Sequence, residues 1–276
     1  MIKNPELKQQ ICIIGCGWLG LPLAKLFLKN GTQIKGSTTS ERKLAALKSY
    51  GIIPFILELT SEGVSGNLEF GLSDCDTLIL NIPPGFRKNP NDDYVSKLKS
   101  MIPFVEASTV KNIIFISSTS VYDDGFPFPL INENNPTSTA SKSALQLVAA
   151  EQLFLENSNF NTTVIRFAGL FGKDRHPAKY LSGKSNLKNG KAPVNLIHLD
   201  DCISIIENII EQNCWNTVFN ASTTPHPNKS TYYTAVCKRL HIPLPHFDTT
   251  SESKGKIIDG SKLARVLGYE FKVVLE

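Results

Sequence analysis

The stretch ICIIGCGWLG, residues 11–20, decides the fold of this chain of 276 residues. Four mostly apolar residues lead into three glycines spaced as G-x-G-x-x-G, and the apolar-rich segment LPLAKLFL follows at 21–28. Glycine allows the tight turn that a buried strand needs before a helix begins. The stretch therefore predicts the first strand, turn and helix of an α/β protein.

Further apolar runs that suit buried parallel strands recur along the chain, with helical patterns between most of them. Together with the first strand, the predicted strands are 10–14, 32–35, 53–57, 77–80, 112–116 and 162–167. This alternation predicts a doubly wound parallel sheet of the Rossmann type.

Two of the intervening helices have clear signals. Leu147, Ala150 and Phe154 fall on one helical face at spacings of three and four. Later in the chain, Asp200 and Asp201 are expected to cap a helix. The buried stripe predicted for that helix is Ile203, Ile206 and Ile210.

Composition narrows the class of protein. The chain has 41% apolar residues and a formal charge of +4, which suits a globular protein with an anionic ligand but provides no basic stripe for nucleic acid. The six cysteines form no C-x-x-C pair and are expected as reduced core residues. Residues 1–10 are polar, and no apolar run approaches the roughly 20 residues that cross a bilayer. We expect a cytoplasmic protein that binds neither nucleic acid nor membrane, and no metal, since no His/Cys/Asp/Glu cluster has ligand spacing.

The spacing of the glycines is typical of a turn that binds the diphosphate of a dinucleotide. Gly15 allows the tight turn, Gly17 lets the backbone approach the diphosphate, and Gly20 lets the helix pack close to the strand. The start of the helix, at Trp18 and Leu19, then aims N–H groups and a partial positive charge at the phosphates. A strand-to-helix turn without a ligand is the alternative.

The end of the second predicted strand indicates which dinucleotide. An Asp or Glu there would bind the ribose hydroxyl of NAD, but residues 34–43 read IKGSTTSERK. Hydroxyl groups followed by a guanidinium suit a 2′-phosphate, so the sequence favours NADP and leaves NAD open. The expected contacts are Thr38, Thr39, Ser40 and Arg42. The alternative is that Arg42 and Lys43 are only the solvated start of a helix.

Four more segments follow the glycine turn: NIPP at 81–84, ISSTSVY at 116–122, RFAGLFG at 166–172 and IHLDD at 197–201. In this order they resemble the extended short-chain dehydrogenase/reductases, and more closely the atypical, YeeZ-like branch related to the NAD-dependent epimerase/dehydratase group. The resemblance spans nearly the whole chain. It implies that Asn81, Pro83 and Ser117 lie at the cofactor cleft, although NIPP could also be an ordinary proline turn.

Members of that family use a Ser or Thr with a Tyr and a Lys, the last two as a Y-x-x-x-K pair on a helix. Ser118 matches the serine, but the helix expected over 141–156 contains no tyrosine. Ser138 or Ser143 stands at the tyrosine position, depending on the register, and a serine hydroxyl is a poor acid near neutral pH. Tyr122 is the candidate substitute donor. Its alternative is a packed aromatic side chain at a strand end.

Other residues are weighed in the same way. The string Tyr180–Lys184 has Y-x-x-x-K spacing, but its glycine argues against a helix. Arg175 and His176 are candidates to meet an anionic substrate, by resemblance to the segment that reaches the substrate lobe. His198, Asp200 and Asp201 look more like capping and packing residues than ligands.

We expect an NAD(P)-binding Rossmann domain over 1–165 and a smaller substrate-binding lobe over 166–276, with a soft boundary across which segments can interleave. Two hypotheses stand together. The first is an NADP-dependent oxidoreductase or epimerase-like enzyme with a non-standard proton donor, acting on a small, anionic or sugar-nucleotide substrate. The second is a non-catalytic NADP-binding sensor or regulatory protein. Because extended relatives often dimerise through two helices, the helix over 141–156 is also a candidate homodimer contact.

Overall fold

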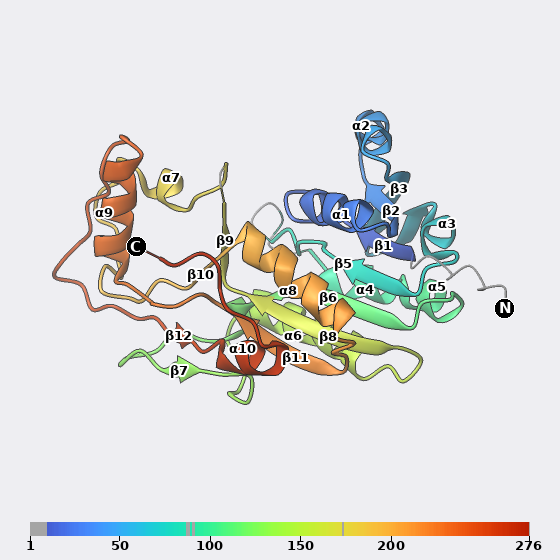
Figure 1. The fold of residues 1–276 in the computed structure, drawn as a ribbon. Helices are drawn as coiled ribbons and strands as arrows, with labels where there is room; N and C mark the ends of the chain where they lie inside the picture. Colours follow the sequence, from blue (N-terminus) through green and yellow to red (C-terminus); the bar gives the residue numbers. More distant parts are fainter. Residues whose placement is uncertain (1–9, 87–88, 90–91, 173, 276) are drawn as a thin grey trace. The chain divides into compact units, whose positions relative to one another are not determined.

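The computed structural model describes residues 10–86, 89, 92–172 and 174–275, and Figure 1 shows its elements. Of the polar segment 1–10, only Gln10 lies within the described residues. Among the described residues, no helix has the length and hydrophobicity to span a membrane. The same residues contain no group of His, Cys, Asp and Glu that could hold a metal ion.

The main sheet has eight strands in the order β11-β8-β6-β5-β1-β2-β3-β4. Their bounds are β1 Gln10–Ile14, β2 Gln33–Thr38, β3 Ile53–Thr60, β4 Gly63–Gly66, β5 Thr77–Leu80, β6 Asn112–Ser118, β8 Asn161–Phe167 and β11 Thr217–Ala221. β1 pairs in parallel with β2 on one side and with β5 on the other, so the strand order reverses at β1. β4 runs antiparallel to β3. The predicted doubly wound, mostly parallel sheet is confirmed.

The second strand runs further than predicted. It was expected over 32–35, but β2 continues to Thr38. The added residues Gly36, Ser37 and Thr38 are buried although they are small or polar, so they carry no apolar signal in the sequence. A Cβ on Gly36 would lie 2.5 Å from the Cys16 sulfur, which shows how closely this strand packs on the glycine turn.

The chain divides into two compact units, each built from several segments. Unit 1 comprises 1–116, 145–164 and 215–217, and unit 2 comprises 117–144, 165–214 and 218–276. The strands β6, β8 and β11 each contribute residues to both units.

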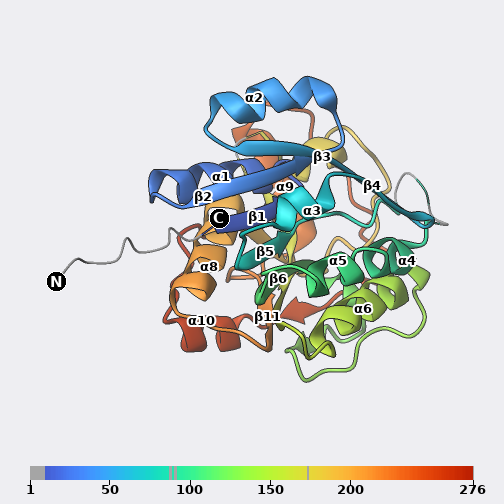
Figure 2. The same ribbon diagram turned by 90° about the vertical axis from the view of Figure 1, so that its right-hand side faces the viewer.

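In unit 1, helices pack on the strands that carry the glycine turn. α1 (Gly20–Lys29) lies on β1 and β2, α2 (Leu44–Ser49) on β3, and α3 (Leu68–Leu72) on β2, β3 and α5 (Ile102–Glu106). Figure 2 views the molecule from the side of α3 and α5. α4 (Tyr94–Lys99) contacts β3. α6 (Lys142–Leu155) buries the predicted stripe Leu147, Ala150 and Phe154, with the Phe154 ring 5.4 Å from that of Phe115.

Among its described residues, unit 2 contains two short parallel strand pairs and four complete α-helices. The pairs are β7 (Leu130–Ile131) with β12 (Ile257–Ile258) and β9 (Gly169–Phe171) with β10 (Leu196–His198). The helices are α7 (Ala178–Leu181), α8 (Leu199–Glu211), α9 (Lys229–Arg239) and α10 (Ser261–Leu267). A core cluster includes Phe171, Tyr232, Val236 and Leu275.

The start of α8 differs from the prediction. The cap is His198, whose side chain accepts from the Asp200 N–H, and both aspartates lie in the first turn. Ile206 and Ile210 are buried as predicted, but Ile203 is only half-buried. The buried face instead adds Cys202, Ile205 and Ile209. Adjacent isoleucines fit more than one helical stripe, so the sequence did not separate them.

Candidate functional site

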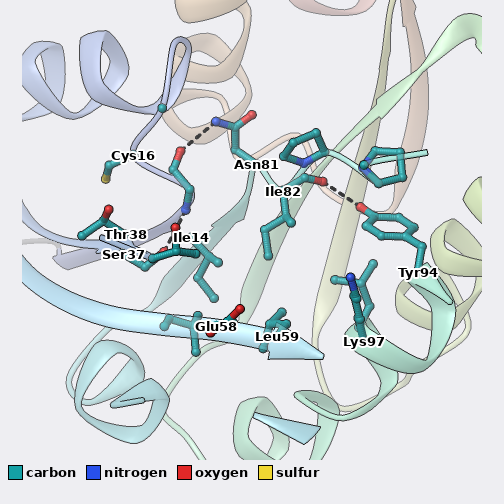
Figure 3. A pocket seen from close by; sticks show the side chains of 18 of the residues that line it. Ile14, Cys16, Ser37, Thr38, Glu58, Leu59, Asn81, Ile82, Tyr94 and Lys97 are labelled. Carbon is teal, nitrogen blue, oxygen red and sulfur yellow. Dashed lines mark hydrogen bonds between the residues drawn. The ribbon is translucent and has the colours of Figure 1, made fainter. Parts of the chain in front are cut away.

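A pocket of about 370 Å³ lies in unit 1 beside the carboxyl ends of β1, β2, β3 and β5 (Figure 3). The residues that line it are 14–17, 37–39, 43, 57–59 and 81–85, together with Asp92, Tyr94, Lys97 and Leu98. Its volume is within the range of small-molecule sites, roughly 300–1,000 Å³. Ligands of open α/β sheets bind at this edge, where the strand order reverses.

The three glycines of the turn have different structural roles. Gly15 has φ +102°, and a Cβ there would lie 2.3 Å from the Asn81 carbonyl oxygen. A Cβ on Gly20 would lie 2.2 Å from the Gly15 carbonyl oxygen. At Gly17, by contrast, an added Cβ meets nothing within 4 Å. The fold itself thus needs Gly15 and Gly20, whereas Gly17 leaves open space beside the backbone.

The cofactor contacts predicted from the sequence fall partly on this pocket. Gly15, Gly17, Thr38, Thr39, Asn81 and Pro83 line it. Trp18, Leu19, Gly20, Ser40, Arg42 and Ser117 are not among the lining residues, although Gly20 begins α1 directly after the turn. Arg42 lies in the short 3-10 helix η1 (Glu41–Lys43), and its neighbour Lys43 is among the lining residues.

The sequence analysis named Lys43 beside Arg42 but missed three other charged groups of the wall, Glu58, Asp92 and Lys97. Lys43 and Glu58 line the pocket with exposed side chains. Asp92 and Lys97 form an ion pair at 2.5 Å, with side-chain exposures of 17% and 25%. Glu58 directly follows the predicted third strand, 53–57, and could have been found by inspecting that strand end as the second was inspected. Asp92 and Lys97 carried no comparable signal.

Two further wall residues are held by burial. The Tyr94 hydroxyl donates to the Ile82 carbonyl oxygen at 2.9 Å, which ties α4 to the segment after β5. Burial, and then the nearby Glu151, raise the pKa of Tyr94 well above its ordinary value. Burial also raises the pKa of the Cys16 thiol to about 12. Neither group ionises near neutral pH, so both serve as wall and not as acid or base.

The predicted catalytic residues belong to unit 2. Ser118 ends β6, is half-buried, and its Oγ accepts from the Ser120 N–H at 3.1 Å. The following 3-10 helix η2 (Thr119–Val121) leads to Tyr122, which is 2% exposed.

The Tyr122 hydroxyl is fully engaged inside unit 2. It accepts from Arg166 Nη1 at 2.6 Å and donates to Asn220 Oδ1 at 3.0 Å. Burial raises the pKa of Tyr122, and the adjacent Arg166 lowers it only in part. The geometry matches the alternative stated for this residue, a packed aromatic side chain.

The tentative substrate residues differ in their surroundings. Arg175 is exposed. His176 is half-buried: its Nδ1 accepts from the Ala178 N–H at 3.1 Å, and its Nε2 lies 3.2 Å from the Tyr232 hydroxyl. Burial, then the positive charges of Arg239 and Lys179, lower the pKa of His176 to about 4. The imidazole is therefore neutral near pH 7.

The remaining predictions from the sequence concern residues that pack or cap. α7 ends at Leu181 and Gly183 has φ +71°, so Tyr180 and Lys184 do not share a helix. Asp201 is fully buried and accepts from the Tyr269 hydroxyl at 2.7 Å and from the Lys272 N–H at 2.7 Å. It binds the C-terminal segment to α8, as expected for a packing residue.

Comparison with solved structures places the fold. UDP-glucuronic acid 4-epimerase from Bacillus cereus, in complex with NAD, has a TM-score of 0.77 and 17% identity over 97% of this chain and 93% of that one. UDP-glucose 4-epimerase from Thermotoga maritima, with UDP-glucose, has a TM-score of 0.75 and 16% identity over 96% and 94%. No protein-family model matches the chain.

The sheet order and these structures together define the fold as the doubly wound one of the NAD-dependent epimerase/dehydratase structures. Protein YeeZ of Escherichia coli K12 is 32% identical over 268 residues, which cover 96% of both chains. The chain belongs to the YeeZ family, as the sequence resemblance predicted. A shorter match, 26% identical over 42% of this chain and 29% of the relative, is UDP-N-acetyl-D-mannosamine dehydrogenase of Methanococcus maripaludis.

Proposed function

We propose that this chain binds NADP in the pocket of unit 1 and acts as an oxidoreductase or epimerase-like enzyme with a non-standard proton donor. The observation that carries the proposal is the open backbone at Gly17 on the wall of the pocket. A diphosphate can approach the chain there at a distance that any side chain would prevent. The N-terminal end of α1, ten residues long, supplies N–H groups and a partial positive charge beside it.

The preference for NADP is supported by the end of β2. Thr38 and Thr39 line the pocket, and the ammonium of Lys43 comes from the same wall. Hydroxyl groups and a cation suit a 2′-phosphate. Ser40 and Arg42 stay as predicted contacts from the adjoining segment. Glu58 supports the NAD alternative, because its carboxylate could accept from a ribose hydroxyl or from the adenine amino group.

Calorimetric titration of the purified protein with NADPH and NADH tests this proposal. We expect tighter binding of NADPH, and Lys43→Ala should weaken NADPH about 5- to 10-fold with little change for NADH, as for one charge-assisted contact. Arg42→Ala is the matched variant from the same 3-10 helix and distinguishes the two cations. If the protein bound neither nucleotide, the proposed function would be contradicted.

The proposed oxidoreductase or epimerase-like reaction is argued from Ser118 and from the family to which the chain belongs. Solved structures with this fold hold UDP-glucose, UDP-glucuronic acid and NAD. We propose a sugar nucleotide or other small anionic substrate for this chain, with Arg175 and His176 as candidate contacts and Ser118 holding the reacting oxygen. Turnover of a sugar-nucleotide panel with bound NADP(H) should fall strongly in Ser118→Ala. Unchanged turnover would exclude that role.

A second function, a non-catalytic NADP sensor, is favoured by two observations. The α6 sequence KSALQLVAAEQLFL contains no tyrosine, and the Tyr122 hydroxyl is occupied by Arg166 and Asn220. This function requires nucleotide binding without turnover, and a partner whose binding depends on the nucleotide.

We also keep a homodimer and a cytoplasmic location as part of the proposal. On α6, Leu145 is 46% exposed and Leu155 is 36% exposed, which supports a contact through this helix. Sedimentation that shows only monomers would contradict the dimer.

A further inference from the structure

Both backbone polar groups of Gly15, which belong to the two peptide units on either side of its Cα, bond to side chains from the two strands that flank β1 or from the residue after one of them. The Gly15 N–H donates to Ser37 Oγ at 2.9 Å, and Asn81 Nδ2 donates to the Gly15 carbonyl oxygen at 2.9 Å. Ser37 lies on β2 and Asn81 directly follows β5. Figure 3 shows both bonds on the wall of the pocket.

Backbone bonds bring these two side chains to the turn. The Cys16 N–H donates to the Ser37 carbonyl oxygen at 3.1 Å, and the Asn81 N–H donates to the Ile14 carbonyl oxygen at 2.9 Å. Parallel pairing of β1 with β2 and with β5 sets this register. The turn is therefore held from two sides by neighbouring strands.

A turn with two glycines within three residues has wide conformational freedom, and a ligand that must order it loses affinity to that entropy. Side-chain bonds that order the turn during folding remove this cost from binding. At Gly15, one side chain bonds to the N–H on one side of the Cα, and another bonds to the carbonyl oxygen on the other side.

We infer that Ser37 and Asn81 are positioning residues that preorganise the backbone at Gly15 for a dinucleotide diphosphate. They act through the backbone that meets the ligand. The inference rests on the proposed dinucleotide site. It goes beyond that site because it assigns part of the nucleotide affinity to two side chains, Ser37 and Asn81, and not to the glycine motif alone.

The residue types make the inference specific. The Asn81 amide must donate to a carbonyl oxygen, and a carboxylate of the same shape cannot. Ser37 must accept from an N–H in a buried place, since Ser37 is 3% exposed. Asn81→Asp therefore removes the bond without removing volume, and Ser37→Thr keeps the hydroxyl that Ser37→Ala removes.

The test is titration of the full chain with NADPH and NADH. We expect Asn81→Ala and Ser37→Ala each to weaken the tighter nucleotide about 5- to 10-fold, the size of one neutral hydrogen bond. Asn81→Asp should lose more, because it also brings a negative charge to the diphosphate. Ser37→Thr should restore affinity. The double variant Ser37→Ala/Asn81→Ala should lose less than the product of the single effects, because both side chains act on the backbone of one residue, Gly15.

Thr109→Val is the matched control. Thr109 Oγ1 donates to the Cys75 carbonyl oxygen at 2.8 Å, also in unit 1, and Thr109 does not line the pocket. It should lose stability to urea without losing nucleotide affinity. A purely structural role for Ser37 and Asn81 would give the same pattern in their variants.

Hydrogen exchange of the nucleotide-free protein tests the inference in variants that fold poorly. Amides of residues 15–17 should exchange faster in Asn81→Ala than in the wild type, relative to amides of α1 in the same sample. Equal exchange, or equal nucleotide affinity of wild type and Asn81→Asp, overturns this inference alone. A wild-type protein that binds neither nucleotide overturns the proposed function and this inference with it.

Discussion

The glycine turn of unit 1 and the Tyr122 cluster of unit 2 use polar side chains in opposite ways. Around Gly15, Ser37 and Asn81 hold the backbone and leave an open pocket beside it. Around Tyr122, the hydroxyl itself is closed in by Arg166 and Asn220. The comparison teaches that polar side chains of one family pattern can either hold a backbone turn open or close off a hydroxyl group.

The physical difference is desolvation. The Tyr122 hydroxyl bonds to a guanidinium and an amide in the interior, and removing it costs both groups that bond. At the turn, the N–H and the carbonyl oxygen of Gly15 are bonded within the protein, while the space beside Gly17 stays open. The contacts around Tyr122 close off a side chain, whereas those at the turn leave part of the backbone facing the pocket.

The largest expected effect comes from Gly17→Val. The added side chain enters space that the fold leaves open, so the melting temperature should stay near wild type while NADPH affinity falls at least about 100-fold, or roughly 2.7 kcal/mol. Calorimetry and thermal denaturation measure the two quantities.

Gly15→Ala provides the contrast to that variant. Residue 15 has a φ of +102°, and a Cβ there would lie 2.3 Å from the backbone carbonyl oxygen of Asn81. The variant should therefore lose about 1–3 kcal/mol of stability as well as NADPH affinity. Equal melting temperatures for the two variants would contradict the roles assigned to these glycines.

Tyr122→Phe sharpens the other side of the comparison. Removing the hydroxyl leaves Arg166, which is 7% exposed, without this partner. We expect a loss of about 1–3 kcal/mol in the free energy of unfolding, measured in urea, and unchanged NADPH affinity. If stability were kept and turnover abolished, Tyr122 would be a proton donor after all.

The smallest effect concerns His176 and pH. Its pKa is lowered from 6.5 to about 4, chiefly by burial, so between these values the unfolded chain binds a proton that the folded protein does not. Stability from this group is present above pH 6.5 and is lost as pH falls toward 4. We expect about 1–2 kcal/mol after allowing for solvent screening of a half-exposed ring.

Urea denaturation at pH 7 and at pH 4.5 measures this effect. His176→Gln, which cannot titrate, should reduce the difference between the two values. An identical pH dependence in the variant would assign the loss to other groups.

Much of unit 1 could be predicted from local sequence. The strand before the glycines, the turn and the α6 stripe depend on residues close together in the chain, through glycine conformation and apolar periodicity. The end of β2 was predicted too short because Gly36, Ser37 and Thr38 are buried by the sheet and not by their own hydrophobicity. Candidate residues were found where a motif marked a strand end, and Glu58 was missed because that end was not inspected.

The sequence by itself determined the Rossmann class, the family and the positions of the glycines, because these follow from short-range patterns in one order. Only the tertiary structure decided which polar groups meet. Ser37 and Asn81 reach Gly15 across 22 and 66 residues, and Tyr122 reaches Asn220 across 98. Such contacts depend on strand order and register, which bring distant residues together without leaving a local pattern in the chain.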